Sequence, residues 1–179
     1  MVDSTAIISK YYKKDSDLYN LLISHSSDVA RKSVEIATRH PELKANIEFL
    51  EEAAMLHDIG IFLTDAPLIG CNGIFDYVCH GYLGREILEF NGLPEHGLVC
   101  ERHTGTGIAL NEILKQNLPL PHRDMLPISI EEQIICFADC FFSKTRIGEE
   151  KSVDDVRKGL SKFGQSSVDK FDDWCQRFL

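Results

Sequence analysis

Four side chains that could bind a metal interrupt the apolar faces of three predicted helices. His25 lies within an apolar stripe, His57 and Asp58 end an apolar run, and Asp139 lies in the most apolar predicted helix. A buried carboxylate without a partner is costly, so each group is expected to be hydrogen-bonded, ion-paired or metal-bound. Singly, each histidine could be a hydrogen-bonded core residue, and the His-Asp pair could cap a helix end. Together, imidazoles and carboxylates converging from packed helices favour a divalent metal such as iron, manganese or zinc.

The elements that must position these groups are helices. Apolar residues recur mostly at helical spacing, and no alternating run is convincing as a strand, so the predicted fold class is all-α. Ser129 and Glu132 form a predicted capping box, and Gly60 is a predicted C-terminal helix stop. Residues 61–79 are expected to form a loop with room for one short helix, and residues 118–127 an extended connector. Helices are predicted from a cap at 15–16 to about residue 39, and over about 45–59, 81–91, 94–103, 107–117, 133–144, 152–163 and 166–178.

Length, charge and cysteine content narrow the class of protein. The chain has 179 residues, the size of a single domain over residues 1–179. Its formal net charge of −9 argues against binding to a nucleic-acid polymer, which depends on excess lysine and arginine. The six cysteines include no C-x-x-C pair and no signal-peptide core is present, so we interpret the cysteines as reduced core thiols. No apolar run approaches the roughly 18 residues of a membrane span. We therefore expect a cytoplasmic protein with no membrane partner.

The run Leu56-His57-Asp58-Ile59-Gly60 resembles the HD superfamily of metal-dependent phosphohydrolases, whose fold is all-α. The family order is a histidine on an early helix, an adjacent His-Asp pair on the next, and an aspartate on a late helix. His25, His57–Asp58 and Asp139 follow this order. The resemblance covers residues 18–146 and implies an HD-domain helical bundle, with residues 147–179 as a C-terminal helical extension. It also implies that these four residues hold one metal ion.

Two further histidines resemble those of the two-metal members. His80 begins an H-x-x-x-G segment, and His103 begins an H-T-x-G segment that is similar to the bacterial diadenosine-tetraphosphatase branch. The resemblance implies that His80 and His103 bind a second ion and that Asp58 bridges the two. The expected cofactor is thus two divalent ions, iron or manganese, with zinc, magnesium, nickel and cobalt as alternatives. Many relatives in that branch carry a lysine near Gly60, which this chain lacks.

Such a centre would hydrolyse a small phosphorylated substrate, namely a nucleotide, a dinucleotide or a related phosphoester, through a metal-activated hydroxide. Asp58 is then catalytic as well as a ligand, and Arg102, Lys144 and Arg146 are candidate phosphate clamps. Lys144 and Arg146 follow Asp139 by one to two helical turns, so only one of them is expected to face the site. A solvated helix end is the alternative interpretation of both.

Three other histidines have weaker interpretations. His96 either supports a metal ligand or lies on the surface, and His40 is expected to cap a helix. The turn His122-Arg123-Asp124 is either a lid that delivers a cation or a surface turn with an internal ion pair.

Two rival functions share these residue types. Some proteins with the same ligand set resemble mixed-valent di-iron oxygenases, and a third hypothesis is a regulatory HD module without turnover. The sequence leaves the oligomeric state open, with a homodimer as one option.

Overall fold

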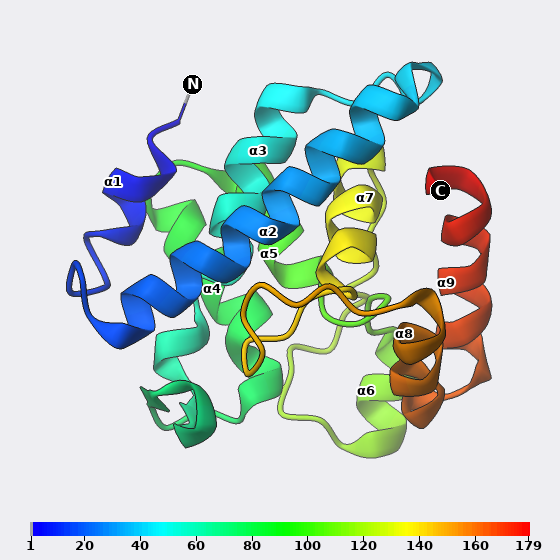
Figure 1. Ribbon diagram of the computed structural model, residues 1–179. Helices are drawn as coiled ribbons and strands as arrows, with labels where there is room; N and C mark the ends of the chain where they lie inside the picture. Colours follow the sequence, from blue (N-terminus) through cyan, green and yellow to red (C-terminus); the bar gives the residue numbers. More distant parts are fainter. Residues whose placement is uncertain (1) are drawn as a thin grey trace.

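The computed structural model describes residues 2–179 and confirms the all-α class (Figure 1). Over these residues the α-helices are α1 Ser4–Ile8, α2 Asp17–Arg39, α3 Ile47–Leu56, α4 His80–Phe90, α5 Pro94–Arg102, α6 Leu110–Gln116, α7 Ile130–Asp139, α8 Val153–Leu160 and α9 Gln165–Phe178. Short 3₁₀ helices cover Pro41–Leu43, Ile61–Leu63, Pro67–Ile69, Tyr77–Cys79 and Ser161–Phe163. Two-residue strands β1 Asp65–Ala66 and β2 Cys71–Asn72 pair antiparallel, with Asp65 opposite Asn72.

Helix α2 is the central element of the bundle. Figure 1 shows it crossing the molecule diagonally, and it packs against α3 and α7. Its N-terminus is fixed by Ser16, whose Oγ accepts the Tyr19 N–H at 3.2 Å, and its helical geometry ends before Pro41. Leu22, His25 and Val29 lie on successive turns of α2 and are all buried. The predicted apolar stripe, which includes a histidine, therefore faces the core.

Helix α3 is shorter than predicted, and Gly60 has a different role from the one expected. The helix ends at Leu56 rather than near residue 59, and Gly60 has an ordinary negative φ of −82°. A Cβ at Gly60 would lie 2.3 Å from the His80 carbonyl oxygen and 2.6 Å from the Gly84 amide nitrogen. Glycine is required there because the backbone of α4 passes directly against it, not because the helix needs a left-handed stop.

Helix α7 also ends earlier than predicted, at Asp139 rather than near residue 144. Ser129 caps it as expected, since its Oγ accepts the Glu132 N–H at 3.1 Å. The Glu132 carboxylate instead accepts the Ile128 N–H and the Arg102 guanidinium, so the reciprocal half of the predicted box is missing. After α7 a strap over residues 141–151 turns back, and its end is tied down where Lys151 Nζ donates to the Cys140 and Phe142 carbonyls.

The C-terminal helices form the expected extension and cover one side of α7 (Figure 1). The Phe137 ring of α7 lies 5.2 Å from the Phe171 ring and 5.4 Å from the Phe178 ring, centroid to centroid. Trp174 is almost completely buried in the same cluster. Burial of large aromatic side chains contributes strongly to stability, so the extension is part of the packed core.

Three further features can be compared with the expectations from the sequence. All six cysteines are free thiols, and four of them are buried. In the described residues, no helix is long and apolar enough to cross a membrane. The predicted loop over 61–79 has more local structure than expected, because it contains three 3₁₀ turns and the small hairpin.

Candidate metal centre

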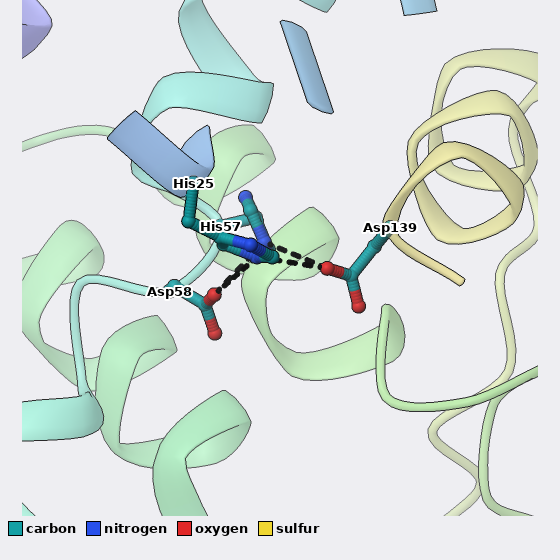
Figure 2. A group of neighbouring side chains, drawn as sticks. All are labelled: His25, His57, Asp58 and Asp139. Atoms are coloured by element: carbon teal, nitrogen blue, oxygen red, sulfur yellow. Dashed lines mark ion pairs between the residues drawn. The ribbon is translucent and has the colours of Figure 1, made fainter. Parts of the chain in front are cut away.

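Four side chains from three parts of the bundle meet at one buried point (Figure 2). His25 comes from α2, His57 and Asp58 from the turn after α3, and Asp139 from the last residue of α7. His25 Nε2 lies 3.1 Å from Asp58 Oδ2 and 2.9 Å from Asp139 Oδ1. His57 Nε2 lies 3.0 Å from Asp58 Oδ2 and 3.5 Å from Asp139 Oδ1. The structure therefore brings together the four residues that the sequence pattern singled out.

The second oxygen of Asp58 faces the other two predicted histidines. Asp58 Oδ1 lies 3.4 Å from His80 Nε2 and 3.5 Å from His103 Nε2, and these two nitrogens are 3.1 Å apart. The Asp58 carboxylate thus stands between two groups of donor atoms, with Oδ2 toward one group and Oδ1 toward the other. This is the placement that a bridging carboxylate needs.

Three of the histidines are oriented by the same local device. The Nδ1 atoms of His57, His80 and His103 lie 2.6, 2.6 and 2.7 Å from the carbonyl oxygens of Ala54, Tyr77 and Cys100, each three residues earlier. Each histidine directly follows a helical segment, at a turn where the carbonyl three residues earlier is within reach of Nδ1. Because Nδ1 is held by this carbonyl, Nε2 of each ring is directed into the centre, where it would bind a metal ion in its unprotonated form.

Several buried atoms of the centre form ion-pair contacts at most and no hydrogen bond. The two carboxylate oxygens of Asp58, Asp139 Oδ1, His57 Nε2 and both ring nitrogens of His25 have no partner with hydrogen-bond geometry. Buried polar atoms are normally hydrogen-bonded, so a cluster of exceptions requires an explanation. Nitrogen and carboxylate donors are the ligands of iron, manganese and zinc, and these residues therefore fit a divalent metal.

The electrostatics of the centre depend on Lys144, whose Nζ lies 2.6 Å from Asp58 Oδ2. Burial opposes the charge of Asp58, but Lys144 and His57 together hold the pKa of Asp58 well below its usual range. Burial likewise disfavours the protonated form of His57, yet Asp58 and Asp139 raise the pKa of His57 to about 10. Burial lowers the pKa of His80 to about 4. The carboxylates are thus ionised, with a proton on His57 that a metal ion would replace.

The three candidate clamps have different surroundings. Lys144 reaches the centre from the strap, where it is mostly buried. Arg102 instead donates through Nη1 to both carboxylate oxygens of Glu132, at 2.9 and 3.1 Å. Arg146 is exposed and lies 3.9 Å from Glu149. Because α7 ends at Asp139, neither Lys144 nor Arg146 is on the same helix as Asp139. Helical spacing therefore does not decide which of the two faces the site.

The remaining histidines lie outside the centre. His96 Nε2 lies 3.3 Å from Glu52 Oε2, and His40 ends α2, with its Nδ1 2.9 Å from Glu42. No ion pair forms within the 122–124 turn, so that part of the surface-turn interpretation is wrong. Arg123 donates to Glu101, which also accepts from Arg85.

The sequence interpretation missed Tyr77. Its ring stacks on that of His80, with the centroids 4.7 Å apart, and it lies beside Lys144. Burial and the charges of Asp58 and Asp139, opposed by Lys144, raise the pKa of Tyr77 to about 12. An aromatic residue three positions before His80 was the available signal.

Comparisons with known proteins agree with this geometry. The family model described as HD domain matches residues 22–142. An uncharacterized protein of Methanocaldococcus jannaschii is 32% identical over 144 residues, which are 79% of this chain and 76% of that protein. Two proteins named tRNA (cytidine(56)-2'-O)-methyltransferase are also similar. The one from Thermoplasma volcanium is 30% identical over 87% of this chain, and the one from Picrophilus torridus is 31% identical over 75%. The chain spans only 41% and 35% of the length of these two. No solved structure gives a significant match.

Three observations agree: the family match, the order of the ligand-type residues in the sequence, and the convergence of these residues in the structure. The chain therefore belongs to the HD domain family.

Proposed function

We propose that the protein is a metal-dependent phosphohydrolase that acts on a small nucleotide, a dinucleotide or a related phosphoester. The observation that carries this proposal is the position of Asp58, whose two oxygens face two separate groups of buried nitrogen and oxygen donors. Membership of the HD family supports hydrolysis of phosphorylated compounds in general.

Each side chain has a definite part in this proposal. His25, His57, Asp58 and Asp139 would hold one divalent ion, and His80 and His103 would hold a second with Asp58 between them. Ions bound there would lower the pKa of a coordinated water and polarise a phosphoryl oxygen. The Nδ1 hydrogen bonds of His57, His80 and His103 keep these rings from turning. We take iron or manganese as the first choice of metal.

Lys144 is the cation best placed to act on the substrate. Its ammonium lies at the centre, against Asp58, and its side chain is 12% exposed. A positive charge that is already oriented at the reacting group stabilises the charge that develops in phosphoryl transfer. Arg102 is less suited to this role because Glu132 already neutralises it.

The methyltransferase names of two relatives do not carry over to this chain in our proposal. This chain corresponds to 41% and 35% of those proteins, and we infer that the shared part is their HD domain. The net charge of −9 also disfavours a substrate as highly charged as a whole transfer RNA. A small anionic substrate is compatible with that charge, because the local field of the centre decides binding.

The test combines metal analysis with a substrate panel. The purified protein is analysed for metals and incubated with mono-, di- and triphosphates, cyclic nucleotides, diadenosine tetraphosphate and bis(p-nitrophenyl) phosphate, with and without oxygen. We expect two ions per chain and phosphate-bond cleavage that is independent of oxygen. Asp58→Ala should lose both metal and activity, whereas Asp169→Ala, on the exposed face of α9, should keep both.

The rival functions give different results. Oxygen consumption with substrate loss but no cleavage of a phosphate bond would identify an oxygenase. A protein that binds the metals but turns over neither kind of substrate would be a regulatory module. Unchanged metal content in Asp58→Ala would show that the assigned ligands are wrong.

A further inference from the structure

We propose that the C-terminal extension, beyond the part of the chain that matches the HD family, forms the pocket that selects the substrate. In this proposal Lys158 and Lys162 bind a second anionic group of the substrate, and Phe163 stacks on a flat ring. The inference rests on the proposed function, because it assigns this pocket to the substrate of the same metal centre.

An open cavity of about 670 Å³ lies directly beside the metal centre, and we call it the anion pocket. Asp139 and Ser143 line it on the side of the centre, and α8 with the following 3₁₀ turn lines the other side. Asp139 belongs both to this wall and to the ligand cluster, so the centre opens into the pocket. Its volume is within the range of about 300–1,000 Å³ that is usual for small-molecule sites.

Lys158 and Lys162 are the cations of this wall that remain available to a ligand. They are four residues apart, about one helical turn, and both are exposed. Among the described residues, neither ammonium group has a hydrogen-bond or ion-pair partner. Lys151, by contrast, is held by two backbone carbonyls, and Arg146 lies near Glu149.

The acidic side chains of the anion pocket already have partners. Glu150 is bonded to Lys32 of α2, with Oε1 2.6 Å from Nζ. Asp155 accepts the Ser152 hydroxyl at 2.6 Å, and Glu149 faces Arg146. Besides the Ser152 hydroxyl, Lys158 lies near enough to Asp155 to help lower the pKa of that carboxyl. A bound anion would therefore meet two ammonium groups that form no hydrogen bond or ion pair, in addition to the charge of the metal centre.

A second cavity of about 380 Å³ adjoins the first. The two share Gly105, Leu160 and Phe163 as lining residues, and the second is lined mainly by the 104–108 turn, Leu118 and Val78. Phe163 is 69% exposed, which is unusual for a large aromatic side chain in a pocket wall. An exposed ring between the anion pocket and a second cavity is suited to stack on a flat, weakly polar group.

The extension is fixed to the catalytic core, so the pocket is preformed. Lys170 Nζ of α9 donates to the Thr106 carbonyl at 2.8 Å, and Phe171 packs on Phe137. Gly107 has a φ of +88°, and a Cβ there would lie 2.6 Å from Pro127 Cδ. The 104–108 turn therefore has no room for a side chain at residue 107. A preformed site does not spend binding energy on ordering loops.

These features specify the chemistry of the substrate. It carries the scissile phosphoryl group at the metal centre, a further anionic group toward Lys158 and Lys162, and a flat ring toward Phe163. A nucleoside polyphosphate has these three parts in this order, whereas a simple sugar phosphate lacks the ring.

The test measures binding by calorimetry on metal-stripped and metal-loaded protein, with ADP and inorganic tripolyphosphate as probes. Lys158→Ala/Lys162→Ala should weaken both probes by roughly tenfold to a hundredfold, as expected for the loss of charge-assisted hydrogen bonds. Phe163→Ala should weaken ADP by about fivefold to tenfold and leave tripolyphosphate within twofold. The matched controls are Lys13→Ala/Lys14→Ala, near the start of α2, and Phe90→Ala, an exposed residue at the end of α4.

The results separate this inference from the proposed function. If phosphate release occurs but the KM and the probe affinities are unchanged in both pocket variants, the inference is wrong and the function stands. If the probes bind and respond as expected but no phosphate is released, the pocket is supported and the function is wrong. Failure of the wild-type protein to bind either probe, or equal weakening of both probes in Phe163→Ala, would overturn the inference.

Discussion

Lys144 Nζ lies 2.6 Å from Asp58 Oδ2, although the two residues are 86 positions apart and lie on no common helix. The contact couples the strap after α7 to the turn after α3. It puts a permanent positive charge next to the carboxylate that stands between the two groups of donor atoms. Since both side chains are largely buried, the charge is only weakly screened by solvent.

Replacement of Lys144 tests its part in the reaction. We expect Lys144→Met to lower kcat about 100-fold, the size of effect seen when one oriented electrostatic group is removed. Metal content should stay at the wild-type value, because Lys144 is a neighbour of the ligands and not one of them. Steady-state kinetics with metal analysis checks this, and Lys13→Met is the surface control. A wild-type kcat would contradict a catalytic role.

The close approach at Gly60 predicts a large effect of a single methyl group. Gly60→Ala would place Cβ 2.3 Å from the His80 carbonyl oxygen, and backbone cannot move aside cheaply. We expect a loss of about 2–4 kcal/mol in the free energy of unfolding, within the range for overpacked cores and strained backbone. Gly159→Ala on α8 is the matched control, because nothing lies within 4 Å of its Cβ. It should stabilise by about 0.5–1 kcal/mol. Urea unfolding of both variants decides the point.

Arg102 is expected to stabilise the fold rather than the transition state. Arg102→Ala leaves the buried Glu132 carboxylate without its cation, which should cost about 2–4 kcal/mol in the free energy of unfolding. The double variant Arg102→Ala/Glu132→Gln should recover part of that loss. In both, kcat of the folded protein should stay within about threefold of wild type. A kcat that falls with wild-type stability would instead support the original clamp hypothesis.

The pKa of His57 predicts how the metal-free protein responds to pH. Since this pKa is raised from about 6.5 to about 10 in the folded protein, the folded state binds more protons than the unfolded state between these values. The stabilisation from His57 is therefore complete below pH 6.5 and is lost as pH rises toward 10.

Unfolding of chelator-treated protein at pH 6.5 and pH 9.5 measures this loss. Metal binding must displace the same proton, so it should tighten over that window and release protons into the buffer. Calorimetry in two buffers of different ionisation enthalpy counts them. Proton-independent binding would show that His57 is not a ligand.

The sequence was enough to predict the fold class and to single out His25, His57–Asp58 and Asp139, because helical periodicity is local and a polar residue in an apolar stripe is visible without coordinates. His80 and His103 were singled out only by the resemblance to the two-metal members of the HD superfamily. The ends of α3 and α7 were not predictable in the same way. Apolar sequence continues after each of these helices. The chain nevertheless leaves the helix, and His57 and Lys144 then make contacts at the metal centre. That competition is between a local preference and distant contacts, which a single sequence does not show.

The partners of charged residues were harder still. Arg102 and Arg123 each have several carboxylates within reach in principle, and only the packing of α5 against α7 and the 118–127 connector selects Glu132 and Glu101. The binding of two metal ions at the centre remains a prediction. So does the role of the residue set as a whole in catalysis.

The glycines at the contact between α4 and its neighbours determine how sequence change affects the centre. Gly60, Gly81 and Gly84 let backbone meet backbone or a thiol, because a Cβ at these positions would lie 2.2–2.8 Å from the nearest atoms. The spacing between the His57–Asp58 turn and the helices that carry His80 and His103 is thus determined by the thickness of the main chain. A change in the size of a core side chain elsewhere would leave this separation in place. The distance between the two parts of the centre therefore depends on a few positions where nothing larger than a hydrogen atom fits.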